Sequence, residues 1–325
     1  MKSLYDQHGR VVRDLRISVT PRCNFACSYC DPLAIGHKDP LGTVSVKDVD
    51  NVVRAAFSLG MTSVRFTGGE PLIRKELPEM IANAKELGVA DVAITTNASL
   101  LKRRLPELLA AGLDRVNISL DAIDPEVFRK ATGGGNIRPV WEGVEAVMAA
   151  GLEPVKLNAV MIRGVNDSEL LRLARLTRDL PVEVRYIEYM HLNNAASEDY
   201  FKAFMPGREM KAKLEEELGE LKPLETEPSA PARLFGVPGW RGAIGFINPV
   251  SEPFCGACSR MRLTSDAKVR PCLMTDRELD LRPALMAEEP IPAICEVFLV
   301  AAHRKVASGI TTPVSRPRTM VAIGG

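Results

Sequence analysis

Short apolar runs and longer amphipathic stretches alternate along the chain from residue 14 to residue 190. The short runs are rich in β-branched residues, which favour strands, and the longer stretches carry apolar residues at steps of three and four, which is typical of helices that bury one face. The predicted strands are Leu15–Thr20, Ser63–Thr67, Asp91–Thr96, Arg115–Leu120, Val155–Ile162 and Val182–Tyr189. The predicted helices are Lys47–Leu59, Glu76–Leu87, Lys102–Ala111, Val140–Ala150 and Ser168–Leu180.

This alternation predicts an α/β fold with a parallel sheet, because parallel strands need crossover connections between them. The periodicity is compatible with either a doubly wound sheet or an incomplete barrel. In both architectures ligands bind at the carboxyl ends of the strands. Beyond Met190 the pattern weakens: Lys211–Leu218 predicts a solvated helix, Pro223–Pro238 a linker or surface loop, and a second unit begins near Trp240. We expect a first domain over residues 1–195 and a C-terminal region over residues 196–325.

The composition narrows the class of protein. Hydrophobic residues make up 46% of the chain, which is enough for a sizeable core. The formal net charge of +1 provides no bulk field for nucleic acid or an anionic membrane, so an anionic ligand must meet a local group of Arg and Lys side chains. The longest apolar stretch, Ile291–Ala302, is short and interrupted by Glu296. We therefore expect a cytoplasmic protein with a small-molecule partner, no nucleic acid and no membrane association.

Six of the seven cysteines fall in two groups of three. We call Cys23, Cys27 and Cys30 the N-terminal triplet; it has the spacing C-x3-C-x2-C and follows the first predicted strand. The C-terminal triplet has the spacing C-x2-C-x13-C and consists of Cys255, Cys258 and Cys272. Grouped cysteines favour metal binding over a disulfide framework. Three thiolates leave one coordination position open at a metal centre that takes four ligands.

Other interpretations of the cysteines remain open at this point. The N-terminal triplet fits a structural zinc with a fourth ligand such as His8 or His37. The C-terminal triplet fits a zinc knuckle or a closed electron-relay cluster, for which Cys295 is the one spare thiol.

The N-terminal triplet, with Tyr29 before its last cysteine and the turn Gly68-Gly69-Glu70 after the second predicted strand, resembles the signature of the radical S-adenosylmethionine (SAM) superfamily. The resemblance implies that the three thiolates bind a [4Fe-4S] cluster whose fourth iron is chelated by SAM. In that superfamily an electron from the cluster cleaves SAM to methionine and a 5′-deoxyadenosyl radical. The implied fold is an incomplete (βα)6 TIM-like barrel, here with a C-terminal extension that carries a second iron-sulfur cluster.

The C-terminal triplet, the motif Arg260-Met261-Arg262 and the terminal Gly324-Gly325 resemble the GTP 3′,8-cyclase family of molybdenum cofactor biosynthesis over nearly the whole chain. The implied reaction is abstraction of the 3′ hydrogen of GTP, followed by closure to (8S)-3′,8-cyclo-7,8-dihydroguanosine 5′-triphosphate. The implied cofactors are two [4Fe-4S] clusters and SAM, and the second cluster holds GTP through its non-cysteinyl iron. The resemblance also implies a reductant protein such as flavodoxin or ferredoxin, product hand-off to cyclic pyranopterin monophosphate synthase, and a homodimer.

The same resemblance assigns individual residues. The residues implied for SAM are Tyr29, Gly68, Gly69, Glu70, Ser119, Arg185 and Met190. Those implied for GTP are Arg16, Arg65, Thr95, Lys156, Arg260, Met261 and Arg262, of which Arg16, Arg260 and Arg262 are also expected to be catalytic. Guanidinium groups suit a triphosphate because their paired N–H donors match its oxygens. The basic tail with Arg316 and Arg318 is expected to bring the two terminal glycines into the barrel lumen.

One position departs from the family pattern, and two other functions compete with the cyclase. Ala98 stands where the family usually has a glycine after the third strand, so the local turn is in question. A peptide-modifying radical SAM enzyme would use the second cluster as a relay and would need a fourth ligand for it. A non-enzymatic zinc or iron-sulfur module would leave the Gly-Gly-Glu turn without an explanation.

Overall fold

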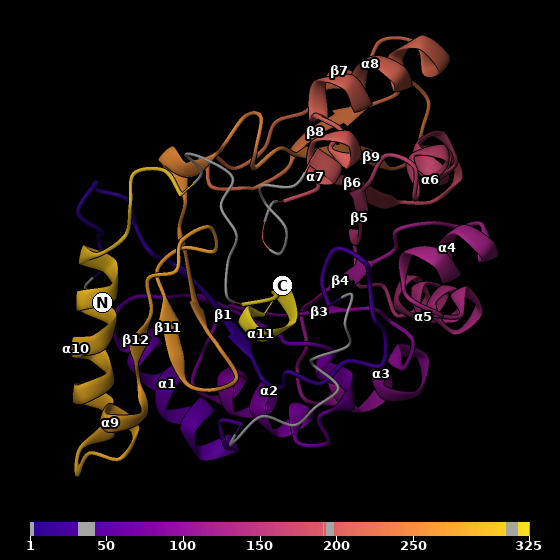
Figure 1. The fold of residues 1–325 in the computed structure, drawn as a ribbon. Coiled ribbons are helices and arrows are strands. Elements are labelled where there is room, and N and C mark those ends of the chain that lie inside the picture. Colours follow the sequence, from indigo (N-terminus) through magenta and orange to yellow (C-terminus); the bar gives the residue numbers. More distant parts are fainter. Residues whose placement is uncertain (1–2, 32–42, 191, 193–197, 310–317, 325) are drawn as a thin grey trace.

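The computed structural model describes residues 3–31, 43–190, 192, 198–309 and 318–324. Its strands form one twelve-stranded sheet in the order β12-β11-β10-β1-β2-β3-β4-β5-β6-β9-β8-β7. The pairs from β10 through β9 are parallel, and the outer pairs on both sides are antiparallel. Figure 1 shows this sheet curving into an open barrel with the helices α1 to α6 on its outside. No helix among the described residues is long and apolar enough to cross a membrane.

All six predicted strands are present, and they form the centre of the sheet. Their bounds are β1 Asp14–Ser18, β2 Ser63–Thr67, β3 Asp91–Thr96, β4 Arg115–Ser119, β5 Val155–Met161 and β6 Val182–Glu188. In β5 and β6 buried and partly exposed residues alternate strictly. Because successive side chains of a strand point to opposite faces, one face packs under the helices while the other carries polar groups into the lumen.

The five predicted helices are also present, within three residues of the expected bounds. They are α1 Val46–Ser58, α2 Leu77–Glu86, α3 Leu101–Ala110, α5 Ile137–Ala149 and α6 Leu170–Asp179. The short helix α4, Pro125–Ala131, was not predicted because seven residues are too few for a helical period to stand out. Its local signals are nevertheless present: the Asp124 carboxylate accepts from the N–H groups of Glu126 and Val127, and Pro125 occupies the first turn.

The chain after β6 adds strands to both edges of the sheet. This region contains α7 Glu198–Ala203, α8 Gly207–Leu218, β7 Lys222–Pro223, β8 Arg233–Gly236, β9 Ala243–Ile247, β10 Arg260–Leu263, β11 Lys268–Arg270, β12 Leu279–Asp280, α9 Arg282–Leu285, α10 Pro290–His303 and α11 Met320–Ile323. Single 3-10 turns occur at Pro71–Ile73, Asp167–Glu169 and Cys255–Ala257. The interpretation of Pro223–Pro238 as a linker or surface loop was wrong in part, because β8 pairs along β9.

Consecutive strands of this region lie on opposite sides of the barrel. β9 pairs with β6, whereas β10 pairs with β1. The segment 248–259 between them therefore crosses the open side of the barrel, and it carries two cysteines of the C-terminal triplet. One continuous sheet thus contains both parts of the chain. The expected domain boundary at residues 195 and 196 lies outside the described residues, as do His37, Arg316 and Gly325.

Candidate active site

Both cysteine triplets line a single cavity inside the open barrel. The other sequence-predicted residues that line it are Arg16, Tyr29, Arg65, Gly68, Gly69, Thr95, Ser119, Arg185, Met190, Arg260 and Arg262. Their strands are parallel neighbours from β10 to β6, so their carboxyl ends converge on this lumen. Glu70, Lys156 and Met261 do not line the cavity.

The Gly-Gly-Glu turn fixes the loop of the N-terminal triplet. The N–H of Gly69 donates to the carbonyl of Thr20 at 2.7 Å, and the N–H of Glu70 donates to that of Arg22 at 2.7 Å. A Cβ atom at Gly69 would lie 2.2 Å from the carbonyl oxygen of Arg22. The glycine is therefore needed first for the close approach of two backbone segments. The other side of the loop is held by α4, where the N–H groups of Ala26 and Ser28 donate to the carbonyls of Thr132 and Ala131.

Glu70 lies behind the cavity wall and is fully buried. Its carboxylate accepts from Thr96 Oγ1 at 2.7 Å, from the Asn97 N–H at 2.7 Å and from the Leu72 N–H at 3.0 Å. Burial raises the pKa of this carboxyl to about 7 despite these donors. The structure thus places Glu70 in contact with the turn after β3, and this contact orients Asn97, whose Nδ2 lies 3.9 Å from Cys23 Sγ.

The position of Ala98 explains why the family usually has glycine there. Ala98 adopts φ 60°, a left-handed conformation that a side chain disfavours, and it is completely buried. Its N–H donates to Thr96 Oγ1 at 2.9 Å, which stabilises the turn. The alanine keeps the glycine-like backbone at this position.

The two triplets have different electrostatic surroundings. Burial raises the pKa of Cys23 to about 11, and burial with the nearby Asp121 carboxylate raises the pKa of Cys27 well above its ordinary value. At Cys258 burial acts in the same direction, but the Arg260 guanidinium and the Lys305 ammonium outweigh it and lower the pKa of the thiol to about 6. The C-terminal triplet is therefore in the more positive environment.

Three arginines of the cavity stand side by side on adjacent strands. Arg16 on β1 is paired in register with Arg65 on β2 and with Arg262 on β10. Burial, reinforced by the neighbouring guanidinium groups, lowers the pKa of Arg16 well below its ordinary value, that of Arg65 to about 10 and that of Arg262 to about 9. Such a row of like charges is unfavourable without a counter-ion.

The remaining basic residues complete this positive field. The Arg260 guanidinium lies over the Phe254 ring at 4.8 Å, and its Nη2 has no hydrogen-bond partner among the described residues. Arg185 forms an ion pair with Glu183. Lys156 is on the same face of β5 as Asn158, one step nearer the amino end of the strand. Among the described residues that line the cavity there are five arginines and no aspartate or glutamate.

Met261 lies on the opposite face of β10 from its two arginine neighbours. It is completely buried and belongs to the main hydrophobic core. The alternation of a strand explains this placement, because Arg260 and Arg262 point into the cavity and the residue between them must point away from it. We therefore leave Met261 out of the candidate substrate site.

Two asparagines of the cavity wall were not assigned a role from the sequence. Asn117 and Asn158 face the lumen, and the side-chain oxygen of each is buried without a hydrogen-bond partner in the described structure. The Asn117 amide is oriented by its bond from Nδ2 to the Ile94 carbonyl at 3.1 Å. The available signal was their spacing, since each stands two residues from a predicted site residue on the same strand face.

The C-terminal helix α11 lies inside the ring of elements, and Figure 1 shows the C-terminus there. Gly324, at φ 74°, packs against Ser18 and Thr67, and its carbonyl accepts a hydrogen bond from Arg262. The N–H of Val321 donates to the thiol of Cys30. The end of the described chain thus contacts both the N-terminal triplet and the arginine row.

The residues considered as fourth ligands lie elsewhere. Cys295 is half-buried between α10 and α1, where its thiol is 3.7 Å from the Ala55 carbonyl and 3.4 Å from Ser58 Oγ. His8 Nε2 is 3.1 Å from the Lys305 carbonyl. In the part of the chain that the structure describes, no three His, Cys, Asp or Glu side chains are placed to hold a single metal ion.

The donor set fits iron-sulfur clusters on its chemistry. Each triplet offers three thiolates and no other protein ligand, and both face a shared cavity with room between them. Fe-S clusters are held by cysteine thiolates, and an all-thiolate set of three leaves one iron for an exogenous ligand.

Comparison with known proteins gives a consistent result. Residues 17–177 match the family model of the radical SAM superfamily, and residues 182–309 match the model described as Molybdenum Cofactor Synthesis C. The GTP 3′,8-cyclase of Moorella thermoacetica is 39% identical, with 99% of this chain and 100% of that protein covered. The GTP 3′,8-cyclase of Heliobacterium modesticaldum is 41% identical, with coverage of 99% and 100%.

Solved structures share the fold at low sequence identity. Streptococcus suis SuiB bound to S-adenosylmethionine superposes with a TM-score of 0.61 at 16% identity, covering 90% of this chain and 67% of that one. The enzyme anSMEcpe with bound AdoMet superposes with a TM-score of 0.56 at 13% identity, covering 94% and 89%.

Proposed function

This chain belongs to the GTP 3′,8-cyclase family within the radical SAM superfamily, and on that premise we propose how its cavity performs the cyclase reaction. The protein converts GTP to (8S)-3′,8-cyclo-7,8-dihydroguanosine 5′-triphosphate in the first step of molybdenum cofactor biosynthesis. The observation that carries the assignment to this cavity is its lining. Two cysteine triplets and five arginines face one lumen, with no carboxylate among the described lining residues.

The N-terminal triplet would hold the cluster that binds SAM, and the C-terminal triplet the second [4Fe-4S] cluster. When bound, this cluster and SAM supply the 5′-deoxyadenosyl radical that takes the 3′ hydrogen of GTP. Tyr29, Gly68, Gly69, Ser119 and Met190 line the cavity around the N-terminal triplet, and we assign them to SAM. The Tyr29 hydroxyl donates to Asp121 at 3.0 Å, which fixes the ring beside this triplet. Glu70 acts from behind by orienting the turn after β3, and we assign it no direct contact.

Arg16, Arg65, Arg260 and Arg262 are assigned to the triphosphate. A bound polyanion supplies the counter-charge that the arginine row lacks, and their paired donors fix its position. Thr95 lines the same wall, Arg185 faces the lumen from β6, and Lys156 adds positive charge from below. The cavity side chains hold GTP in one orientation and exclude water, which protects a radical from side reactions.

Some calls rest on the family alone and stay proposals. We propose a cytoplasmic location, a reductant protein such as flavodoxin or ferredoxin, hand-off of the product to cyclic pyranopterin monophosphate synthase, and a homodimer. A domain division at residues 195 and 196 is a further proposal.

The test is turnover by the reduced protein after cluster reconstitution. We expect SAM and GTP to give 5′-deoxyadenosine and a cyclised nucleotide in equal amounts, and GTP binding to weaken at least tenfold in Arg16→Gln with the iron content unchanged. Lys102→Gln, at an exposed ion pair with Glu142, is the matched control. Formation of 5′-deoxyadenosine with no GTP-derived product would contradict the substrate assignment and leave the superfamily assignment in place.

A further inference from the structure

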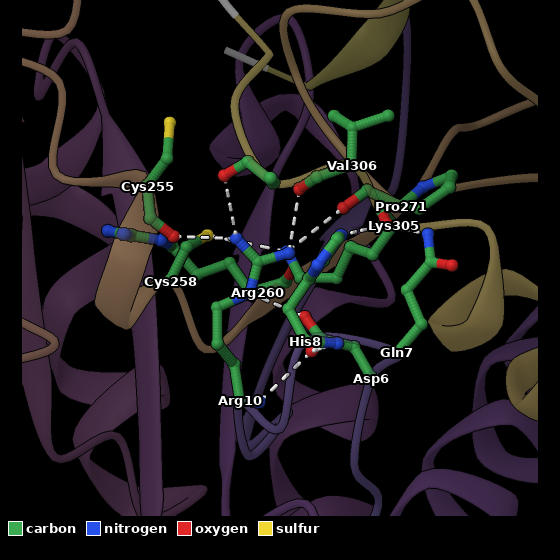
Figure 2. A network of polar contacts seen from close by, with 11 residues as sticks. Asp6, Gln7, His8, Arg10, Cys255, Cys258, Arg260, Pro271, Lys305 and Val306 are labelled. Carbon is green, nitrogen blue, oxygen red and sulfur yellow. Dashed lines mark hydrogen bonds and ion pairs between the residues drawn. The ribbon is translucent and has the colours of Figure 1, made fainter.

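Lys305 is a buried ammonium group outside the cavity lining, and it contacts both limbs of the C-terminal triplet. Its side chain follows α10, and the residue is 2% exposed. Nζ donates to Cys258 Sγ at 3.4 Å, to the Arg260 carbonyl at 2.9 Å and to the Pro271 carbonyl at 3.2 Å. Pro271 directly precedes Cys272. All three N–H groups of the ammonium are therefore used on residues in or beside the triplet, as Figure 2 shows.

The N-terminal hairpin keeps Lys305 in this place. Arg10 Nη1 donates to the Cys255 carbonyl at 2.6 Å and to the Ala307 carbonyl at 3.1 Å, and its Nη2 donates to the Val306 carbonyl at 2.7 Å. The Arg10 guanidinium is itself fixed by its ion pair with Asp6 at 2.6 Å. Figure 2 shows this network joining the hairpin to the Cys255 and Cys258 loop. The segment that follows α10 is thus tied to the triplet by two cations.

The counter-charge of Lys305 is the thiolate. Among the described residues no carboxylate forms an ion pair with this ammonium, whereas Arg10 has Asp6. A buried cation needs a nearby anion, and Cys258 is the group in hydrogen-bonding contact that can carry a negative charge. The N-terminal triplet differs, because the donors to Cys23 are the neutral N–H of Phe25 and the neutral side-chain amide of Asn97.

We propose that Lys305 is a positioning residue that raises the reduction potential of the cluster held by the C-terminal triplet. Charge and hydrogen bonds at the ligating sulfurs set the potential of an iron-sulfur cluster. A reduced cluster carries one more negative charge than the oxidised cluster, so an ammonium bonded to Cys258 stabilises the reduced state more. The inference rests on the proposed function, because it requires a cluster at this triplet. It assigns the two clusters different potentials, with the C-terminal one easier to reduce.

The test is a redox titration followed by electron paramagnetic resonance on the full chain. Cys23→Ala, Cys27→Ala and Cys30→Ala together remove the N-terminal cluster, so that the signal belongs to the C-terminal one. In this background we expect Lys305→Gln, which keeps N–H donors and loses the charge, to shift the midpoint potential downward. At a fixed potential the ratio of reduced to oxidised cluster should fall roughly tenfold.

Two further variants separate charge from structure. Lys305→Arg keeps a cation and should titrate close to the parent. Lys85→Gln removes the partner of Asp114 on α2 and should leave the potential unchanged. An unchanged potential in Lys305→Gln, with about four irons per chain retained, would contradict the inference alone. Loss of iron from Lys305→Gln would also contradict it, because Lys305 would then hold the cluster instead of tuning it. Absence of iron in the parent triple variant would contradict the proposed C-terminal cluster itself, and the inference with it.

Discussion

At the scale of single residues, the arginine row is a feature that the fold alone does not explain. Arg16, Arg65 and Arg262 lie in register on adjacent strands, with their pKa values lowered by burial and by one another. The cost of such a row is borne by the protein without ligand and is relieved when a polyanion binds. This balance favours tight binding of a triphosphate over general stability.

The lowered pKa values predict a pH dependence for GTP binding. In the protein without GTP, burial and Arg185 lower the pKa of Lys156 to about 8, and burial with Arg260 lowers that of Arg262 to about 9. Raising the pH through this window removes positive charge from the site, while a bound triphosphate raises both pKa values again. We expect the affinity for GTP to fall about tenfold from pH 7 to pH 9.5, with proton uptake on binding.

Calorimetry in two buffers of different ionisation enthalpy, without SAM or reductant, measures this effect. Lys156→Gln should reduce the proton uptake near pH 8, whereas the exposed control Lys102→Gln should not. A constant affinity up to pH 9.5, or binding without proton uptake, would show that these groups are not coupled to the ligand.

At the scale of elements, the segment between β9 and β10 has to cross the open barrel, and Glu188 holds its start. The buried Glu188 carboxylate accepts from the N–H groups of Gly207 at 2.8 Å, Val250 at 2.9 Å and Ser251 at 2.9 Å. The end of β6 is thereby tied to the loop that precedes Cys255. This one carboxylate links the sheet to the C-terminal triplet.

We expect Glu188→Ala to cost about 2 to 4 kcal/mol of unfolding free energy, because three backbone donors lose their acceptor. The crossing segment should loosen, and iron should fall from about eight to about four per chain, with the N-terminal cluster retained. Chemical denaturation and iron analysis measure both effects. Glu209→Ala, on an exposed ion pair with Arg163, is the control. Full iron content in Glu188→Ala would refute the anchoring role.

The tail helix α11 makes a second prediction at this scale. Removal of residues 319–325 should leave about eight irons per chain and abolish cyclisation, because Gly324 and Val321 contact the arginine row and Cys30 from inside the lumen. Gly324→Val should have the same effect, since a Cβ there would lie 3.0 Å from Ser18 Cβ at a positive φ. Ala322→Ser, on the partly exposed side of α11, should be active. Normal turnover by the truncated protein would exclude a role for the tail.

At the scale of the whole molecule, the sequence predicted what local patterns determine. Strands β2 and β3 have their expected bounds because β-branched runs between helical stretches are a local signal. The partners of β9 and β10 could not be predicted, because edge pairing is decided by contacts far apart in the chain. The same holds for Cys295, whose place depends on how α10 packs against α1.

Site residues follow the same division. The cysteine triplets and arginines stand in short motifs and were assigned from the sequence, and the structure brings them to one cavity. Met261 was assigned by its place in a motif, although the two-residue period of a strand already indicates the opposite face. Lys305 had no signal, because its role depends on a buried contact with Cys258 across 47 positions.

The most direct test of the account is the fate of the 3′ hydrogen of GTP. The reduced protein with both clusters should be given SAM and GTP deuterated at C3′, and the products analysed by mass spectrometry. We expect deuterium in 5′-deoxyadenosine, in amounts equal to the cyclised nucleotide. Unlabelled 5′-deoxyadenosine formed alongside unchanged GTP would contradict the claim that this cavity positions GTP for hydrogen abstraction at C3′.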